Sequence, residues 1–308
     1  MKKEKKPPRL RRILVGGLFL LIFLALMGLL AFGYASSRVI CVERTSVYLE
    51  DLPPGFDGKK ILFVSDIDMV GLSGPHAIKG MFDDLERLGA DILILGGDYA
   101  GESLLEKLNS TGDALEREEK RREVFSHLAE FDAPLGKYAV TGENDAGAAD
   151  IAAELALGRI TYLNDSAGSI QLGGDALTII GLKDHSQGSL SYGEIARHVD
   201  SGACVIAVTH NPAAISAVMT SEAADTGQWA DLILSGHTHH GQAVVGERSL
   251  IQLDQQESRY AGGWSKESGV HVLVSPGAGC DTVNFRLNTT AQVHLITLKS
   301  GSPPMAGQ

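Results

Sequence analysis

Five short apolar runs in this chain each end in a carboxylate or an imidazole. They span residues 60–65, 90–95, 137–141, 203–209 and 232–235. Each run has the length and aliphatic content of a buried strand. In an open α/β sheet the carboxyl ends of the strands lie along one edge, where binding sites are built. The sequence therefore predicts an α/β fold that brings five polar strand ends to one site.

The richest of these endings is Gly236-His237-Thr238-His239-His240-Gly241. The two glycines allow the backbone to turn sharply, so that His237 and His239 can point to one place. Neutral imidazole is the commonest protein ligand of transition metals. A polar surface turn that happens to hold histidines is the alternative interpretation of this segment. Three imidazoles in four residues directly after a strand favour a metal site.

The other four strand endings add oxygen and nitrogen donors of the same kind. They supply Asp66, Asp68, Asp98, Glu143, Asn144 and His210. Side chains alternate along an extended chain, so Asp66 and Asp68 are expected on the same side. A single aspartate after a strand is more often a cap or turn residue. Five such endings in one chain predict a metal site with more than one ion.

The order of the motifs resembles the five blocks of the calcineurin-like metallophosphoesterases, which usually read D-x-H, G-D, G-N-H-(D or E), H and G-H-x-H. The corresponding segments here are Asp66-x-Asp68, Gly97-Asp98, Gly142-Glu143-Asn144-Asp145, His210 and Gly236-His237-x-His239. Flanking segments, such as Leu52-Pro-Pro-Gly-Phe-Asp-Gly58, are similar to the membrane-anchored bacterial branch of that family. The resemblance covers about residues 44–298. It implies a four-layer αββα sandwich, preceded here by one transmembrane helix.

The resemblance also implies a ligand assignment and a reaction. One ion would be bound by Asp66, Asp68 and His239, the other by Glu143, His210 and His237, and Asp98 would bridge the two. The cofactors would be two divalent or mixed-valence ions, drawn from Mn, Fe, Zn and Mg. A hydroxide shared by the ions would attack phosphorus, and no side chain would serve as nucleophile.

Three positions depart from the family pattern. Asp68 stands where a histidine is usual, Glu143 where an asparagine is usual, and Asn144 where the other histidine is usual. The site therefore offers four carboxylates instead of two, which favours Mn or Fe over Zn. The same charge should weaken the attraction of anionic substrates.

The exchange at Asn144 removes the residue that is thought to assist the leaving group. An amide can donate a hydrogen bond to a phosphate oxygen, but it cannot release a proton at neutral pH. His76 and His240 are the sequence's candidate acids, and His185 is a weaker one. For each of them an ordinary surface histidine is the alternative interpretation.

The amino terminus predicts a membrane anchor. Residues 13–34 form 22 uncharged positions, long enough for a helix that crosses a bilayer. Seven basic residues and one acidic residue precede them, which predicts a cytoplasmic amino terminus. A cleaved signal peptide is the alternative, but the apolar run is long for one and no good small-x-small cleavage site follows it. We therefore expect a single-pass protein of the cell membrane with its catalytic domain outside the cytoplasm.

The predicted organisation is a basic cytoplasmic stem (1–12), the transmembrane helix (13–34), a linker (35–43), the phosphoesterase domain (44–298) and a disordered tail (299–308). Since the stem contributes +6 to a total of −11, the remainder carries −17. This charge argues against nucleic acid as a partner. The expected partners are a small phosphorylated substrate, lipid-linked substrates included, and the membrane through the amino-terminal helix.

Two functions from different classes follow from this sequence. The favoured one is a metal-dependent phosphoesterase that hydrolyses a phosphomonoester, phosphodiester or pyrophosphate outside the cytoplasmic membrane. The alternative is a catalytically degenerate scaffold of the same fold that binds metal or another ligand. Asp68 and Glu143 replace the usual ligands by oxygen donors rather than by apolar side chains, which indicates a retuned site and favours the enzyme.

Overall fold

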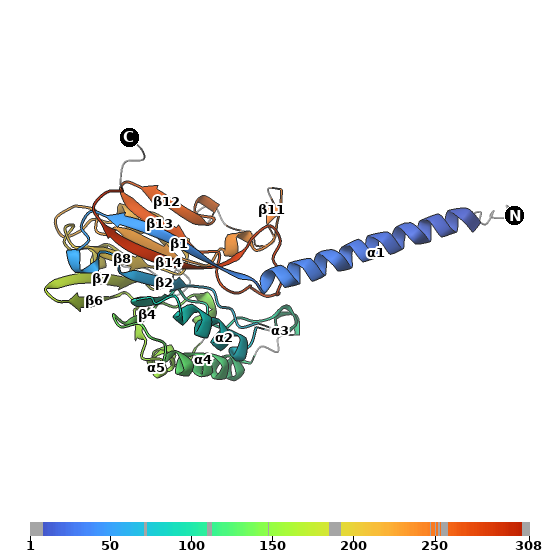
Figure 1. The fold of residues 1–308 in the computed structure, drawn as a ribbon, viewed down its shortest axis with the longest axis horizontal. Helices are drawn as coiled ribbons and strands as arrows, with labels where there is room; N and C mark the ends of the chain where they lie inside the picture. The colour runs from blue at the N-terminus through green and yellow to red at the C-terminus, as the bar shows by residue number, and fades with distance from the viewer. Residues whose placement is uncertain are drawn as a thin grey trace.

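The computed structural model describes residues 9–70, 73–109, 113–146, 148–184, 192–246, 248–249, 251, 253 and 258–303. A long helix projects from one end of a body in which two sheets pack face to face (Figure 1). This helix, α1 (Arg9–Ser37), is, within these residues, the one helix long and apolar enough to cross a membrane. The arrangement confirms the predicted αββα sandwich with one amino-terminal apolar helix.

The first sheet has the strand order β1-β14-β2-β3-β4-β5. Its strands are β1 (Ile40–Leu49), β14 (Ala291–Ser300), β2 (Lys60–Val64), β3 (Ile92–Leu95), β4 (Lys137–Ala139) and β5 (Thr161–Tyr162). Its outer face is covered by α2 (Pro75–Glu86), α4 (Ala114–Leu128) and α5 (Ile151–Leu157). The short helix α3 (Leu104–Asn109) follows β3, and the 3-10 turn η2 (Glu143–Asp145) follows β4.

The second sheet has the order β12-β13-β9-β8-β7-β6. Its strands are β12 (Gly263–Glu267), β13 (Val270–Val274), β9 (Leu232–Ser235), β8 (Val205–Val208), β7 (Asp175–Gly181) and β6 (Ser166–Leu172). Helices α6 (Tyr192–Ala196) and α7 (Ile215–Thr220) pack on its outer face. The remaining elements are the hairpin β10 (Val244–Val245) and β11 (Arg248–Ser249), and the 3-10 turns η1 (Pro54–Phe56), η4 (Pro212–Ala214) and η5 (His239–Gly241).

Alternation along the strands produces the four layers. In β2, Ile61 and Phe63 belong to the core between the two sheets, whereas Leu62 and Val64 face the helices. All four side chains are buried. Successive side chains of a strand point to opposite faces of the sheet, so a strand that is apolar on both faces must be covered by a layer on each side. The continuous apolar runs in the sequence therefore determine the sandwich.

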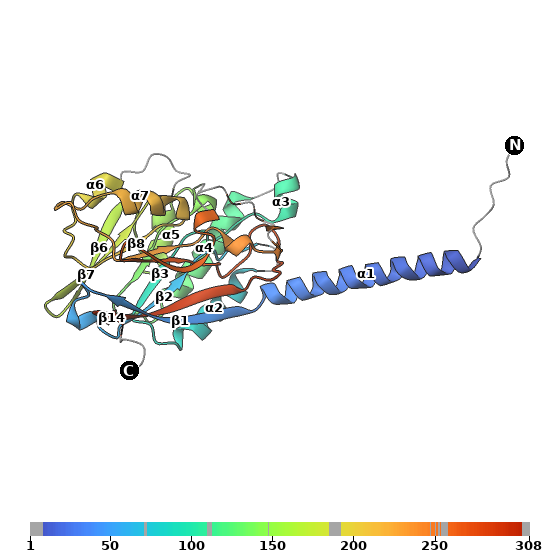
Figure 2. The ribbon, with the colours of Figure 1, turned by 90° about the horizontal axis from the view of Figure 1, so that it is seen from above.

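The strand directions place the polar strand ends at the end of the body from which α1 emerges. Strand β1 begins three residues after α1 and runs away from it, β14 runs parallel to β1, and β2 runs antiparallel to β14. The carboxyl end of β2 therefore returns toward α1, and β3 and β4, which are parallel to β2, end at the same edge. Both ribbon views show α1 leaving the body at this edge (Figures 1 and 2).

Some elements differ from the sequence prediction. Strand β1 begins at Ile40, inside the segment predicted as a linker, and β14 continues to Ser300, inside the predicted tail. Strands β6 and β12 were not predicted, because their residues are largely polar and exposed and carry no apolar run.

A buried ion pair joins two of the covering helices. The guanidinium of Arg121 on α4 donates to both carboxylate oxygens of Glu154 on α5, at 2.6 and 3.0 Å. Both side chains are nearly inaccessible, 3% and 1% exposed. Removing one partner leaves the other charge buried and without compensation.

We expect Glu154→Ala to lower the free energy of unfolding by about 3–5 kcal/mol. The measurement is urea unfolding of the full chain in detergent, followed by circular dichroism. Glu118→Ala is the matched control, because Glu118 pairs with Arg122 on the exposed face of α4 at 3.5 Å; its cost should stay within about 0.5 kcal/mol. Equal losses in the two variants would contradict a structural role for the buried pair.

Candidate metal centre

All seven predicted metal ligands meet at the α1 end of the body. Asp66 and Asp68 follow β2, Asp98 follows β3, Glu143 lies in η2 after β4, His210 follows β8, and His237 and His239 follow β9. Their donor atoms form three overlapping groups, each within 4.8 Å: Asp66, Asp68 and His239; Asp66, Asp98 and His210; and Glu143, His210 and His237. The first and third groups are the two three-residue sets expected from the sequence.

Several of these donor atoms approach each other without forming a hydrogen bond. Nε2 of His210 lies 2.9 Å from Oε2 of Glu143 and 3.4 Å from Oδ2 of Asp98. Yet His210 Nε2 and Glu143 Oε2 have no hydrogen-bond partner among the described residues, nor do Oδ2 of Asp66 and of Asp68. Buried polar atoms are normally paired. Donor atoms that converge without pairing fit a shared cation, so the residues present suit metal ions.

The backbone at the ligands is strained. Asp66, Asp68, Asp98, His237 and His239 all have positive φ, from 40° to 74°. Residues other than glycine rarely adopt this region, and each such residue costs on the order of 1–3 kcal/mol when surrounding structure holds it there. The sheet ends thus hold the ligand side chains in orientations that a relaxed backbone would not give.

The surrounding backbone fixes the ligands further. Nδ1 of His210 is 2.8 Å from the carbonyl oxygen of Gly96, a contact that leaves Nε2 facing the cluster. The amide of His237 donates to Oδ1 of Asp66 at 2.7 Å. A Cβ atom at Gly236 would lie 2.3 Å from Oδ2 of Asp66, so only glycine fits there. Such outer contacts orient metal ligands and tune their basicity.

Burial and charge shift the pKa values of the cluster in opposite directions. Burial raises the pKa of Asp98 to about 7, against the attraction of His210. Burial alone would lower the pKa of His237, but the carboxylate of Glu143, 2.8 Å from Nδ1, raises that pKa to about 9. Burial opposes the ionisation of Glu143, but His210 and His237 lower its pKa. The carboxylates and imidazoles thus favour each other's charged forms, and bound cations would supply the positive charge in place of the imidazoles.

Comparison with known proteins agrees with this geometry. The sequence profile of the calcineurin-like phosphoesterases matches residues 59–241, which contain all seven predicted ligands. The chain belongs to the calcineurin-like phosphoesterase family. The predicted family resemblance is therefore confirmed, and the protein is a metal-dependent hydrolase of phosphoester bonds.

Three relatives show how far the similarity extends. An uncharacterized metallophosphoesterase of Aquifex aeolicus (strain VF5) is 26% identical over 87% of this chain and 95% of its own length. The uncharacterized metallophosphoesterase YkuE of Bacillus subtilis (strain 168) is 24% identical over 87% of this chain and 90% of its own length. A transmembrane protein with metallophosphoesterase domain from Danio rerio is 24% identical over 85% of this chain and 57% of its own length.

Asn144 forms hydrogen bonds with two of the predicted metal ligands of this phosphoesterase, Asp68 and Asp98. Its side-chain amide donates to Oδ2 of Asp98 at 2.9 Å and to Oδ1 of Asp68 at 3.1 Å, and its backbone amide donates to Oδ1 of Asp98. Both amide protons of the side chain are thereby engaged with carboxylates. In this arrangement Asn144 holds two metal ligands together, a role that the sequence did not reveal.

The candidate acids lie in different places. His240 is exposed in η5, next to the ligand His239, and it lines a cavity of about 790 Å³ together with Arg248 and Ser258. His76 is exposed in the first turn of α2 and forms no hydrogen bond or ion pair with the described site residues. His185 lies outside the described residues. Of the two that are described, only His240 adjoins the metal cluster along the chain.

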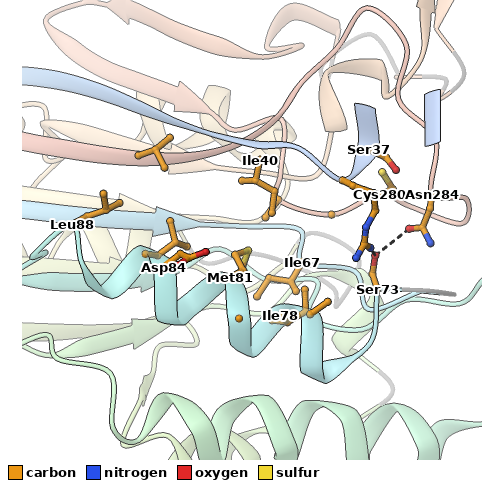
Figure 3. Close-up of a pocket in the computed structure, with 17 residues that line it drawn as sticks. Ser37, Ile40, Ile67, Ser73, Ile78, Met81, Asp84, Leu88, Cys280 and Asn284 are labelled. Carbon is orange, nitrogen blue, oxygen red and sulfur yellow. Dashed lines mark hydrogen bonds between the residues drawn. The ribbon is translucent and has the colours of Figure 1, made fainter. Parts of the chain in front are cut away.

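A second cavity, of about 550 Å³, lies behind the metal site between β1 and α2 (Figure 3). Its walls are mostly apolar and include Ile40, Ile67, Ile78 and Met81. None of the seven ligands lines it. Ile67 separates it from the metal site, because the side chain between Asp66 and Asp68 faces this cavity and the carboxylates face the cluster.

Arg286 supports the metal centre and was not predicted. Its side chain is fully buried and donates to the carbonyl oxygens of Pro276, Gly277, Gly279 and His239. The amide of Gly279 in turn donates to the carbonyl of Asp66. One guanidinium therefore joins the loop that carries His239 to residues 276–279, which in turn contact the backbone of Asp66. A lone arginine in a loop gives no sequence signal of this kind.

Asp145 performs a similar task for Asp98. Its buried carboxylate accepts hydrogen bonds from the backbone amides of Asp98, Tyr99 and Gly142, at 2.8 to 3.2 Å. Burial, together with the charge of Asp98, raises its pKa to about 7. Three buried amides depend on this one side chain.

We expect Asp145→Ala to lower metal affinity by about 10- to 100-fold, because the loop that carries Asp98 loses its support. The measurement is titration of the metal-free full chain with Mn²⁺, followed by calorimetry. Asp150→Ala is the control: Asp150 caps α5, so its loss should cost about 1 kcal/mol of stability without changing metal affinity. An unchanged affinity in Asp145→Ala would exclude the supporting role.

Proposed function

We propose that this protein is a membrane-anchored phosphoesterase that hydrolyses lipid-linked phosphoesters or pyrophosphates at the membrane surface. The observation that supports it is the position of the metal centre. The strand ends that hold the ligands lie at the end of the body from which the apolar helix α1 emerges. A substrate whose phosphate stands at the bilayer surface would reach such a site without leaving the membrane.

The proposed topology places the body outside the cytoplasm. Arg9, Arg11 and Arg12 precede the apolar part of α1, whereas Arg38 alone follows it before the first strand. Basic residues concentrate on the cytoplasmic side of membrane helices. We therefore assign the amino terminus to the cytoplasm and the metal centre to the opposite face.

The ligand set favours hard or intermediate ions. Asp66, Asp68, Asp98 and Glu143 give four carboxylates against three imidazoles, and carboxylate-rich sites suit Mn or Fe better than Zn. Bound ions would supply an activated water and a clamp for the phosphoryl oxygens. The side chains of this protein would hold those ions, exclude competing water from the buried carboxylates and orient the bound phosphate.

Leaving-group chemistry narrows the proposed substrate class. With its amide engaged by Asp68 and Asp98, Asn144 offers no proton to a departing alkoxide. A pyrophosphate or a phosphodiester with a stable leaving group needs little help from an acid. Where an acid is needed, His240 is the proposed donor, because it adjoins His239 and faces the 790 Å³ cavity.

The first test of the proposed function measures metal and turnover together. The full chain in detergent, purified without chelator, should contain close to two ions per chain and hydrolyse bis-p-nitrophenyl phosphate with added Mn²⁺. Asp98→Asn should lower turnover by more than the roughly 100-fold cost of changes outside the ligand set, while Asp57→Asn, on the exposed surface, should not. Bound metal without turnover on any phosphoester would instead support the scaffold alternative.

The role of His240 is tested by changing the leaving group. His240→Ala should slow hydrolysis of an alkyl phosphoester by about 10²- to 10⁴-fold, the usual contribution of a general acid, and leave p-nitrophenyl release nearly unchanged. His76→Ala is the control and should affect neither substrate. Equal losses on both substrates would mean that His240 only shapes the site.

A further inference from the structure

Exposed apolar side chains are concentrated on the short helix α3. Outside α1, the described residues include seven large apolar side chains that are exposed: Val39, Leu104, Leu105, Leu108, Leu115, Leu157 and Val245. Three of them lie on the single short helix α3, where Leu105 and Leu108 are 70% and 71% exposed. Scattered apolar residues are normal on a surface, but a gathered patch marks a contact site.

Helix α3 is attached to the loop between β13 and β14, residues 275–290, which also contacts α1. The amide of Leu104 donates to the carbonyl of Thr282 at 2.9 Å, and Nζ of Lys107 donates to Oγ1 of Thr282 at 2.8 Å. Lys107 also pairs with Asp281 at 3.2 Å. Both ribbon views place α3 at the end of the body from which α1 emerges (Figures 1 and 2).

The same loop, residues 275–290, also packs against the final turn of α1. The amide of Arg286 donates to the carbonyl of Gly33 at 3.0 Å, and a Cβ atom at Gly33 would lie 2.0 Å from the ring of Phe285. Gly33 and Ser37 are buried, whereas the preceding apolar residues of α1 are exposed. The helix is therefore docked on the body over its final turn.

The length of α1 indicates where this loop lies along the membrane normal. About 20 helical residues cross the hydrocarbon core. Counted from Ile13, the first residue after Arg12, such a crossing ends at about Phe32. The contact between Gly33 and the loop then lies at the boundary of the hydrocarbon, and α3, attached to that loop, lies at the same level.

Two further elements belong to this end. The amide of Val244 in the hairpin β10–β11 donates to the carbonyl of Leu287, and Asn288 donates back to the carbonyl of Val244. This holds the exposed Val245 near the loop. Arg38 donates to Ser73 at the mouth of the apolar cavity, and Ser73 donates to Asn284 of the loop (Figure 3). These contacts make the junction continuous from α1 to α2.

We propose that the leucine face of α3, together with Val245 of the β10–β11 hairpin, is a second membrane contact that inserts into the surface of the bilayer. Burying the apolar side chains in the interface would gain free energy, while Lys107 and Arg38 would meet the headgroups. With α1 as one attachment and α3 as another, the body could not rotate freely about the helix. The metal centre would be held facing the lipid headgroups.

The contact is tested by fluorescence in lipid. Leu105→Trp in the full chain, reconstituted in phosphatidylcholine nanodiscs, should lose fluorescence when the acyl chains are brominated. Leu157→Trp is the matched control, because Leu157 ends α5 just before β5, and β5 runs parallel to β4 and so begins at the sheet edge opposite α1. The signal of the unchanged chain, with Trp229 and Trp264, gives the background. Equal quenching in the two variants would overturn the proposal.

A second measurement separates this contact from the proposed catalysis. Leu105→Glu combined with Leu108→Glu should lower hydrolysis of a phosphoester lipid in vesicles and leave hydrolysis of bis-p-nitrophenyl phosphate unchanged. The quenching experiment does not depend on turnover, so an inactive enzyme would still report the contact. If Leu105→Trp escaped quenching and the double variant instead abolished a dimer in detergent, the face would be a contact between two chains and the proposal would be wrong.

Discussion

Three buried carboxylates and the half-buried Glu143 converge on three imidazoles at the strand ends, and the rest of the structure depends on holding these charges together. Asp66, Asp68 and Asp98 are 0 to 2% exposed. Buried charges are tolerated only when they are paired or bind metal. The strained backbone at the ligands, the close contacts without hydrogen-bond geometry and the arginine beneath the loops are all consequences of holding these groups together.

The sheets supply the rigidity that this charge requires. The two sheets bury a common core, and their parallel strands end at one edge. The ends of β2, β3, β4, β8 and β9 lead into the candidate ligands within a few residues, so the register of the sheets sets the positions of these side chains. Loops alone would relax the positive φ values at Asp66, Asp98 and His239. The geometry of the candidate metal centre therefore depends on the packing of the two sheets.

The sequence revealed the parts of this arrangement that have a local signature. The apolar runs predicted the core strands, and the residues that follow them predicted the ligand set, because both signals lie within a few residues of each other. Arg286 had no such signal: its partners lie 7 to 47 residues away and are backbone carbonyls. Asn144 was read as a lost acid, since only the folded chain shows its amide between Asp68 and Asp98.

Two of the three departures from the family pattern, Asp68 and Asn144, contact each other. Asp68 and Glu143 add negative charge, and Asn144 is placed to donate to Asp68 and Asp98. A histidine at position 144 could present only one N–H from each ring nitrogen, whereas the amide offers two protons from one atom. Replacing the histidine at position 68 by a carboxylate thus creates an acceptor that the amide at 144 satisfies. The amide at position 144 and the carboxylate at position 68 therefore support each other within the candidate metal centre.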